Sequence, residues 1–190
     1  MVRNYTDEPV NREVVERIVD TARRGPSAGN SQGQSFVVVT DPQRRARIAE
    51  VCGEPNYVAQ GFDPWISRAP VHVAVCVSKQ IYFERYAEPD KVGGEVPEEY
   101  WPVPYWWVDG GAALMLLLLA TVDEGLAAGF LGSHAMPDLH TVLGLPDHMA
   151  PIGIVTIGHP APDRRSGSLK RGRRPLSDVV HWEQWDGAAE

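Results

Sequence analysis

Cysteine is scarce in this sequence. The two that occur, Cys52 and Cys76, lie in apolar segments and belong to no CxxC pattern. Thiols placed in this way favour buried, unpaired side chains over a disulfide or a metal site, and they favour a reducing compartment. Residues 1–8 also lack the features of a signal peptide, because they already contain an aspartate and a glutamate. We therefore expect a cytoplasmic protein.

Long hydrophobic runs and an excess of positive charge are also lacking. The most apolar window, residues 112–122, is about half of the roughly 20 residues that cross a bilayer. Asp109 and Asp123 bound it, so a buried core helix is expected and no membrane partner. The chain has 25 acidic and 18 basic residues, a net charge of -7, which argues against a nucleic-acid partner.

Common metal and nucleotide motifs are missing too. The six histidines show neither HExxH nor a paired Cys and His spacing, so we expect no metal site. Neither a Walker loop nor GxGxxG is present, which argues against a nucleotide held by a P-loop or in Rossmann fashion. Transient binding of a nicotinamide nucleotide remains compatible with the sequence.

What is present predicts one domain over residues 1–190, with helices and strands alternating at first. Apolar residues recur at helical spacing in 10–24, where Asn11 is a suitable N-cap and Gly25-Pro26 ends the pattern. Asp41-Pro42 supplies a cap and a first residue for a second helix. The other expected elements are strands at 35–40, 69–77 and 152–157, a long helix from Asp109 to about 124 or 126, a turn at 129–132 and a short helix at 137–143.

An aromatic segment at about 78–107 interrupts this order. It contains four prolines and the pair Gly93-Gly94, which exclude one long element, and it has too many aromatic residues for a solvated linker. We interpret it as an excursion that covers a site. Tyr105 and Trp106 are candidate residues of a lid over the substrate, and packing at a dimer interface is the alternative.

The loop Pro26-Ser-Ala-Gly-Asn-Ser-Gln32 is the most informative feature. Seven small or amide residues stand between the first helix and the first strand. Glycine and alanine let the backbone approach a planar ligand closely, while Ser27, Asn30 and Gln32 supply hydrogen-bonding groups. We interpret this segment as a cofactor loop, although a plain connection rich in turn formers has a similar composition.

Two further motifs have competing interpretations. Residues 25–29 match the GxSxG elbow of hydrolases, in which Ser27 would be the nucleophile, with Asp109 or Asp138 and His159 as partners. An elbow needs a strand before the serine and a helix after it, which is the reverse of the order expected here. The basic segment 170–174, in a polar tail that starts at about 161, can bind a phosphate or simply be solvated.

Six segments together resemble the FMN-dependent nitroreductase family. The resemblance extends in order over nearly the whole chain and is carried by Val2–Val10, Pro26–Gln32, Asp109–Ala113, Leu143–Pro146, Ile157–Pro160 and Arg173–Leu176. It implies an α+β fold with a central mixed sheet flanked by helices. It also implies an intertwined homodimer with two FMN sites at the subunit interface.

The resemblance also assigns site residues. It places Arg3 near the flavin pyrimidine edge and ribityl chain, and Pro26, Ser27, Asn30 and Gln32 against the ring. Leu131 and Gly132 match a backbone segment at the hydride-accepting edge of the ring, and Arg171 and Arg173 match a basic pair at the phosphate. Family members usually carry two more basic residues and a serine before the position of Val2, so we infer that the natural start lies upstream of Met1.

The implied activity is hydride transfer from NADH or NADPH through bound FMN to a flat small-molecule acceptor, such as a nitroaromatic or a quinone, in a ping-pong sequence. No dedicated catalytic side chain is assigned, because the flavin supplies the reactivity. Three alternatives stay open: a specialised relative that dehalogenates, cleaves flavin or dehydrogenates its substrate, a flavin-binding protein with little turnover, and a serine hydrolase that uses Ser27.

Overall fold

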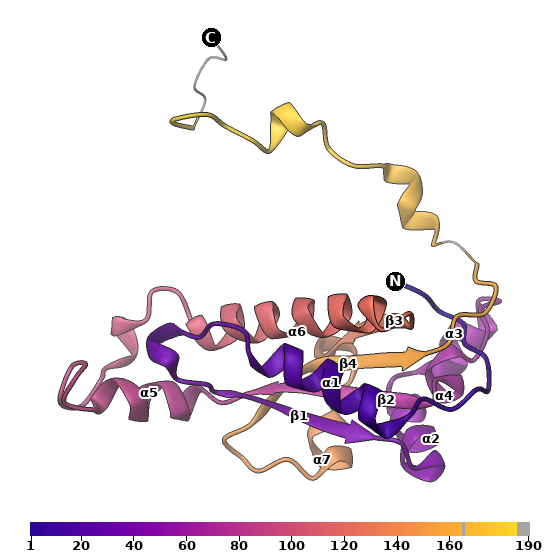
Figure 1. Cartoon of the computed structure of the whole chain (residues 1–190), viewed down its shortest axis with the longest axis horizontal. Helices are drawn as coiled ribbons and strands as arrows, with labels where there is room; N and C mark the ends of the chain where they lie inside the picture. The colour runs from indigo at the N-terminus through magenta and orange to yellow at the C-terminus, as the bar shows by residue number, and fades with distance from the viewer. Residues whose placement is uncertain (165, 186–190) are drawn as a thin grey trace.

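A four-stranded sheet forms the centre of the computed structural model, which describes residues 1–164 and 166–185 (Figure 1). Its strands are β1 (Gln34–Val39), β2 (Val71–Val77), β3 (Ala127–Gly132) and β4 (Ala150–Gly158). They lie in the order β1-β2-β4-β3. Helices cover both faces of this sheet, which confirms the expected α+β class.

The sheet is antiparallel rather than mixed, and the expectation of a mixed sheet is corrected in this respect. Each of the three pairings, β1 with β2, β2 with β4 and β4 with β3, is antiparallel. β2 and β3 run in the same direction, but β4 lies between them. No two described neighbours therefore form a parallel ladder.

The first two helices begin at the N-cap residues that the sequence predicts. The Asn11 side chain accepts a hydrogen bond from the Glu13 amide, and the Asp41 side chain accepts one from the Arg44 amide. Both bonds satisfy backbone donors that a helix leaves free in its first turn. The α-helices are α1 (Arg12–Arg23), α2 (Pro42–Val51), α3 (Glu54–Ala59), α4 (Trp65–Arg68), α5 (Lys79–Ala87), α6 (Tyr105–Asp123) and α7 (Leu139–Leu143).

Two predicted boundaries are wrong. α6 begins at Tyr105, one turn before Asp109, because Pro104 precedes it and the aromatic packing around Trp106 fixes its first turn. The glycines of 129–132 belong to β3 and do not form a turn. They allow close packing instead, since a Cβ at Gly129 would lie 2.7 Å from the Val2 carbonyl oxygen and 2.8 Å from the Trp65 ring.

The alternating side chains of β2 supply both apolar layers. Val71, Val73 and Val75 pack with α1 and α6 on one face, while Ala74 and Cys76 pack with α2, α4 and α7 on the other. All seven residues of β2 are buried, as expected for a central strand. α6 is long and apolar enough to span a membrane by length and composition alone, and Ala113, Leu117 and Thr121 on one of its faces are fully buried in the core.

A third apolar group, which we call the aromatic cluster, lies where β2 ends. It consists of Val77, Tyr82, Val96, Trp101 and Trp106. The segment 78–107 is therefore ordered by its own small core and includes α5. From residue 166 on, the described chain leaves the body as an extended tail (Figure 1). Its apolar side chains stay exposed, with Leu176 at 74%, Trp182 at 71% and Trp185 at 78%.

Candidate functional site

The 26–32 loop has an unusual backbone. It includes a short 3-10 turn at Ala28–Asn30, and Gly29, Asn30 and Gln32 have φ values of 61°, 55° and 53°. Left-handed conformations are uncommon for residues other than glycine. The Ser27 Oγ accepts a hydrogen bond of 2.9 Å from the Gln32 amide, which closes the loop. Within the described chain the carboxamides of Asn30 and Gln32 are exposed and have no hydrogen-bond partner.

Three side chains that the sequence analysis did not assign to a cofactor site support this loop. The Ala28 amide donates to Asp109 Oδ2 at 2.8 Å, and the Tyr82 hydroxyl donates to the same oxygen at 2.7 Å. Arg85 Nε donates to the Gly29 carbonyl at 3.0 Å. Burial and the adjacent Asp109 carboxylate raise the pKa of Tyr82, so the hydroxyl keeps its proton and remains a donor.

Arg3 lies in a second group of residues, at the N-terminal segment. Val2 N–H donates to the Ala128 carbonyl and Tyr5 pairs with Pro160, so the segment runs between β3 and residues 159–163. This arrangement places two guanidinium groups over one ring. The Arg3 group is 5.9 Å and the Arg164 group 5.1 Å from the centroid of Phe62.

Arg164 lies beside Arg3 in this group, and sequence reasoning missed it. Its Nη1 donates to the carbonyls of Gln60 and Gly61, at 3.1 and 3.4 Å, which fixes the side chain beside Arg3. Arg164 follows the Ile157–Pro160 motif by only four residues, and the pairing of that motif with the N-terminal segment is the signal that could have indicated it.

The other predicted residues lie elsewhere. Leu131 and Gly132 end β3, where Leu131 is buried and Gly132 pairs with Gly153. Arg171 ends the 3-10 helix Gly167–Arg171 of the tail, and Arg173 follows it. Both arginines are exposed on the part of the chain that leaves the body in Figure 1.

The predicted residues thus form separate groups within one chain. The 26–32 loop lies at the end of the sheet where Gln34 faces Val77 and Gly33 bonds Ser78. The N-terminal group lies at the opposite end, near Ala128 (Figure 1). Strands of six residues span about 20 Å between these ends. One chain therefore does not assemble these residues into one pocket.

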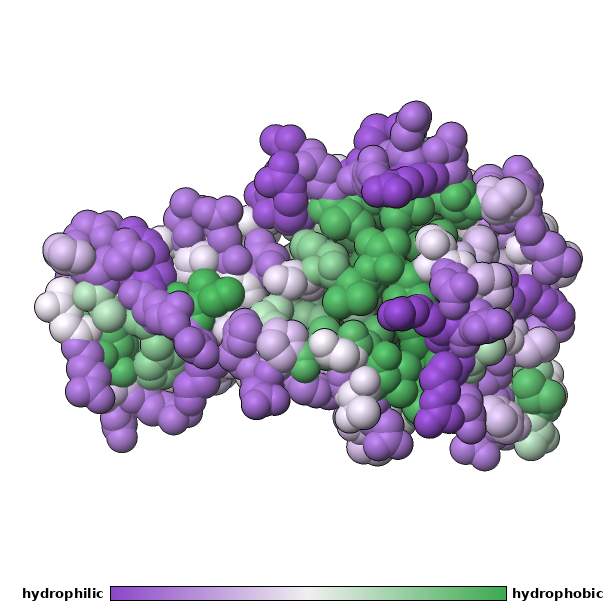
Figure 2. Space-filling view, turned by 90° about the horizontal axis from the view of Figure 1, so that it is seen from below, coloured by the Kyte–Doolittle hydropathy of each residue, from purple (hydrophilic) through white to green (hydrophobic). Residues whose placement is uncertain are grey.

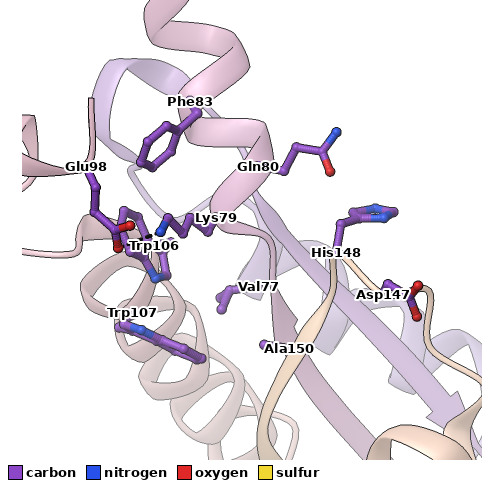
Figure 3. Close-up of a pocket in the computed structure, with 10 residues that line it drawn as sticks. All are labelled: Val77, Lys79, Gln80, Phe83, Glu98, Trp106, Trp107, Asp147, His148 and Ala150. Atoms are coloured by element: carbon purple, nitrogen blue, oxygen red, sulfur yellow. Dashed lines mark hydrogen bonds and ion pairs between the residues drawn. The ribbon is translucent and has the colours of Figure 1, made fainter. Parts of the chain in front are cut away.

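A cavity of about 720 Å³ lies beside the aromatic cluster (Figure 3). Lys79 points between Trp106 and Glu98, with its Nζ 2.6 Å from Glu98 Oε1 and 5.6 Å from the Trp106 ring. Asp147 and His148 form the opposite wall. Among the predicted site residues Trp106 alone lines this cavity, and only 6% of its surface is exposed. Tyr105, beside it, is 44% exposed.

The geometry does not support a serine hydrolase. Ser27 follows α1 and precedes β1, which is the reverse of a nucleophile elbow. Its Oγ accepts from a backbone amide, while His159 lies 3.6 Å from Glu8 beside the N-terminal segment. Asp109 binds Ala28 and Tyr82. The described residues also contain no group of three side chains suited to a metal ion.

The fold is that of an α+β protein in which a loop of left-handed residues with two exposed carboxamides lies at one end of an antiparallel sheet. The Nitroreductase family profile matches residues 1–159, and the chain belongs to this family. It is 31% identical over 186 residues to the FMN reductase (NAD(P)H) of Bacillus subtilis, covering 97% of this chain and 70% of that protein.

The chain is similar to two further proteins over nearly its whole length. The iodotyrosine deiodinase of Nematostella vectensis is 28% identical over 196 residues, which cover 94% of this chain and 70% of that protein. The structure of the hypothetical oxidoreductase YcnD from Bacillus subtilis superposes with a TM-score of 0.74 at 27% identity, over 98% of this chain and 71% of that one.

Proposed function

We propose that the protein is an FMN-dependent oxidoreductase that takes electrons from NADH or NADPH and passes them to a flat oxidised acceptor, such as a nitroaromatic or a quinone. The 26–32 loop carries this proposal, because it combines a tight 3-10 turn with two exposed carboxamides and belongs to a chain of the nitroreductase family. Its likeness to an FMN reductase that is named for NAD(P)H supports the choice of cofactor and donor.

The described residues fit a flavin mononucleotide. The loop offers two exposed carboxamides without protein partners to a ligand that has a polar ring edge. Gly29 has a φ of 61° and lies against the Tyr86 ring, where a Cβ would be 2.6 Å from Cε2, so glycine lets the loop pack this closely on α5. Arg164 and the tail residues Arg171 and Arg173 supply guanidinium groups for an anion, and Arg3 supplies donors for the ring edge and the ribityl chain.

In this proposal, bound FMN supplies the hydride chemistry. Pro26, Ser27, Asn30 and Gln32 orient the ring and exclude water from one side of it. Leu131 and Gly132 present backbone at the reactive edge of the ring, so their side chains are free to be apolar or absent. Arg171 and Arg173, together with Arg164, would bind the terminal phosphate, and Arg3 would lie at the pyrimidine edge and the ribityl chain. The donor and the acceptor occupy the same space in turn.

We propose further that the active form is a homodimer, in which the loop of one chain meets the N-terminal group of the other. Two observations support this assembly. The outer face of α6 exposes Val108, Met115, Leu119 and Val122 at 51%, 55%, 59% and 64%. The apolar tail side chains are exposed too. Figure 2, which shows the side of the molecule away from the tail, has a further apolar area framed by polar residues. Apolar surface of this kind marks protein contacts.

Two other activities are compatible with the fold. Dehalogenation has a specific observation in its favour, the 28% identity to an iodotyrosine deiodinase. A flavin-binding protein with little turnover would use the same loop. We place the protein in the cytoplasm, since both cysteines are free and buried.

The experiment is an anaerobic mixing test. The purified protein is reconstituted with FMN, its absorbance is recorded, and NADH or NADPH is added. Loss of the yellow colour, followed by its return with nitroaromatics and quinones, is the expected result. Bleaching that only a halogenated aromatic reverses would select dehalogenation, and no bleaching with either nucleotide would select a binding protein. A chain that takes up no FMN would refute the proposal.

A further inference from the structure

The 26–32 loop is fixed by contacts that come from much later in the chain. Arg85 reaches the Gly29 carbonyl from 56 residues away, and Asp109 reaches the Ala28 amide from 81 residues away. The α5 helix thus packs against the loop on one side, while the first turns of α6 place Asp109 beneath it. Local sequence alone does not dictate the conformation of this loop.

The Asp109 carboxylate is unusual because it is buried without a cationic partner. Only 9% of its surface is exposed, and its Oδ2 accepts two hydrogen bonds from neutral donors. No ion pair to it is found among residues 1–164 and 166–185. Burying a carboxylate costs free energy that neutral hydrogen bonds offset only in part. An apolar residue at this position of the helix would cost less free energy to bury. The aspartate is therefore explained by its hydrogen bond to the loop.

Tyr82 completes the arrangement. Its hydroxyl binds Asp109, and its ring packs so closely on the loop that a Cβ at Gly33 would lie 2.4 Å from Cε2. Tyr82 is itself fully buried in the aromatic cluster. The segment 78–107 therefore supports the loop from behind, and this role differs from both a lid and a dimer contact.

We propose that Asp109 is a positioning residue that sets the conformation of the 26–32 loop, and that Tyr82 orients its carboxylate. The left-handed residues Gly29, Asn30 and Gln32 make the loop costly to form without outside support. Two hydrogen bonds to one buried carboxylate supply this support at Ala28. The effect on flavin affinity rests on the proposed function, whereas the effect on loop order does not.

The test compares Asp109→Asn, Asp109→Leu and Tyr82→Phe with the wild type. Thr121→Val is the matched control, because Thr121 is a buried polar residue of the same helix whose hydroxyl binds only the Leu117 carbonyl. Flavin affinity is measured by fluorescence titration with FMN and with riboflavin, well below the unfolding temperature of each variant. Hydrogen exchange of the Ala28 amide is measured without flavin.

Asp109→Leu is expected to weaken FMN and riboflavin by the same factor, about tenfold or more, because it removes the acceptor of a charge-assisted bond. Asp109→Asn keeps an acceptor oxygen and should therefore lose less flavin affinity than Asp109→Leu. The Ala28 amide should exchange faster in both variants, and Thr121→Val should change neither readout. If Asp109 only stabilised the fold, Thr121→Val and Asp109→Leu would lower the unfolding temperature alike, and exchange of the Ala28 amide would not become faster.

Unchanged flavin affinity and unchanged Ala28 exchange in folded Asp109→Leu would overturn the inference. If Asp109→Leu does not fold, Tyr82→Phe decides by the same two readouts, since it removes only the hydroxyl. If the wild type binds neither flavin, the proposed function fails, and Ala28 exchange alone decides on the role of Asp109.

Discussion

His72 gives the sharpest test of the core, because it is fully buried in β2. Its Nε2 lies 2.6 Å from the Ile66 carbonyl, which makes it the donor nitrogen, and Nδ1 is buried without a partner. Burial lowers the pKa of His72 to about 4, and the Arg45 guanidinium contributes in the same direction. The histidine is therefore neutral in the folded chain over most of the accessible pH range.

The sign of the pH dependence follows from this shift. Between pH 6.5 and about 4 the unfolded chain binds a proton at this position and the folded chain does not, so stability falls as the pH falls. Below pH 4 both states are protonated and the loss is complete. From pH 7.5 to 4.5 His72 should remove about 2 to 3 kcal/mol from the free energy of unfolding.

The assay is urea denaturation of the wild type and of His72→Gln across this pH range. Glutamine can still donate to the Ile66 carbonyl but does not titrate, so the variant should lose less stability on acidification by that amount. The other titrating groups are common to both chains and cancel in the difference. Equal pH slopes for the two proteins would refute the assignment of a buried neutral histidine.

Three other substitutions test the site and the assembly. Arg164→Ala should weaken FMN by about tenfold and leave riboflavin unchanged, because only FMN has a phosphate, and equal loss for both flavins in a titration would contradict this role. Gly33→Ala should displace the Tyr82 ring, with a contact of 2.4 Å to relieve, and lower flavin affinity in the same titration; an affinity like that of the wild type would argue against close packing. Leu119→Glu should place a charge on the exposed face of α6 and yield monomers in sedimentation, whereas a stable dimer would locate the interface elsewhere.

Local signals determined which elements the sequence could predict. α1 and α2 were predicted well, because a cap and a regular apolar period lie within the same short stretch. α5 was missed because the prolines and glycines that follow it obscured a helix of nine residues. β3 was missed because its glycines, read as turn formers, in fact allow the N-terminal segment and Trp65 to approach closely.

The candidate site also contains residues that local sequence could indicate and residues that it could not. The 26–32 loop was singled out from its own composition, and the structure gives three of its residues left-handed conformations; its role toward a cofactor stays a prediction. The contacts of Asp109, Tyr82 and Arg164 could not be predicted, although Asp109 was considered as a hydrolase partner, since each acts on a segment more than 25 residues away in the chain. The positions of Arg171 and Arg173 depend on where the tail docks, which one chain does not determine.

The separation of the loop from the N-terminal group has a genetic consequence. In the proposed dimer each of the two sites takes its loop from one chain and Arg3 from the other. A chain damaged at Asp109 and a chain damaged at Arg3 would then restore each other when mixed, because one site of the heterodimer receives both defects and the other receives none. Two inactive alleles would show complementation in the same cell.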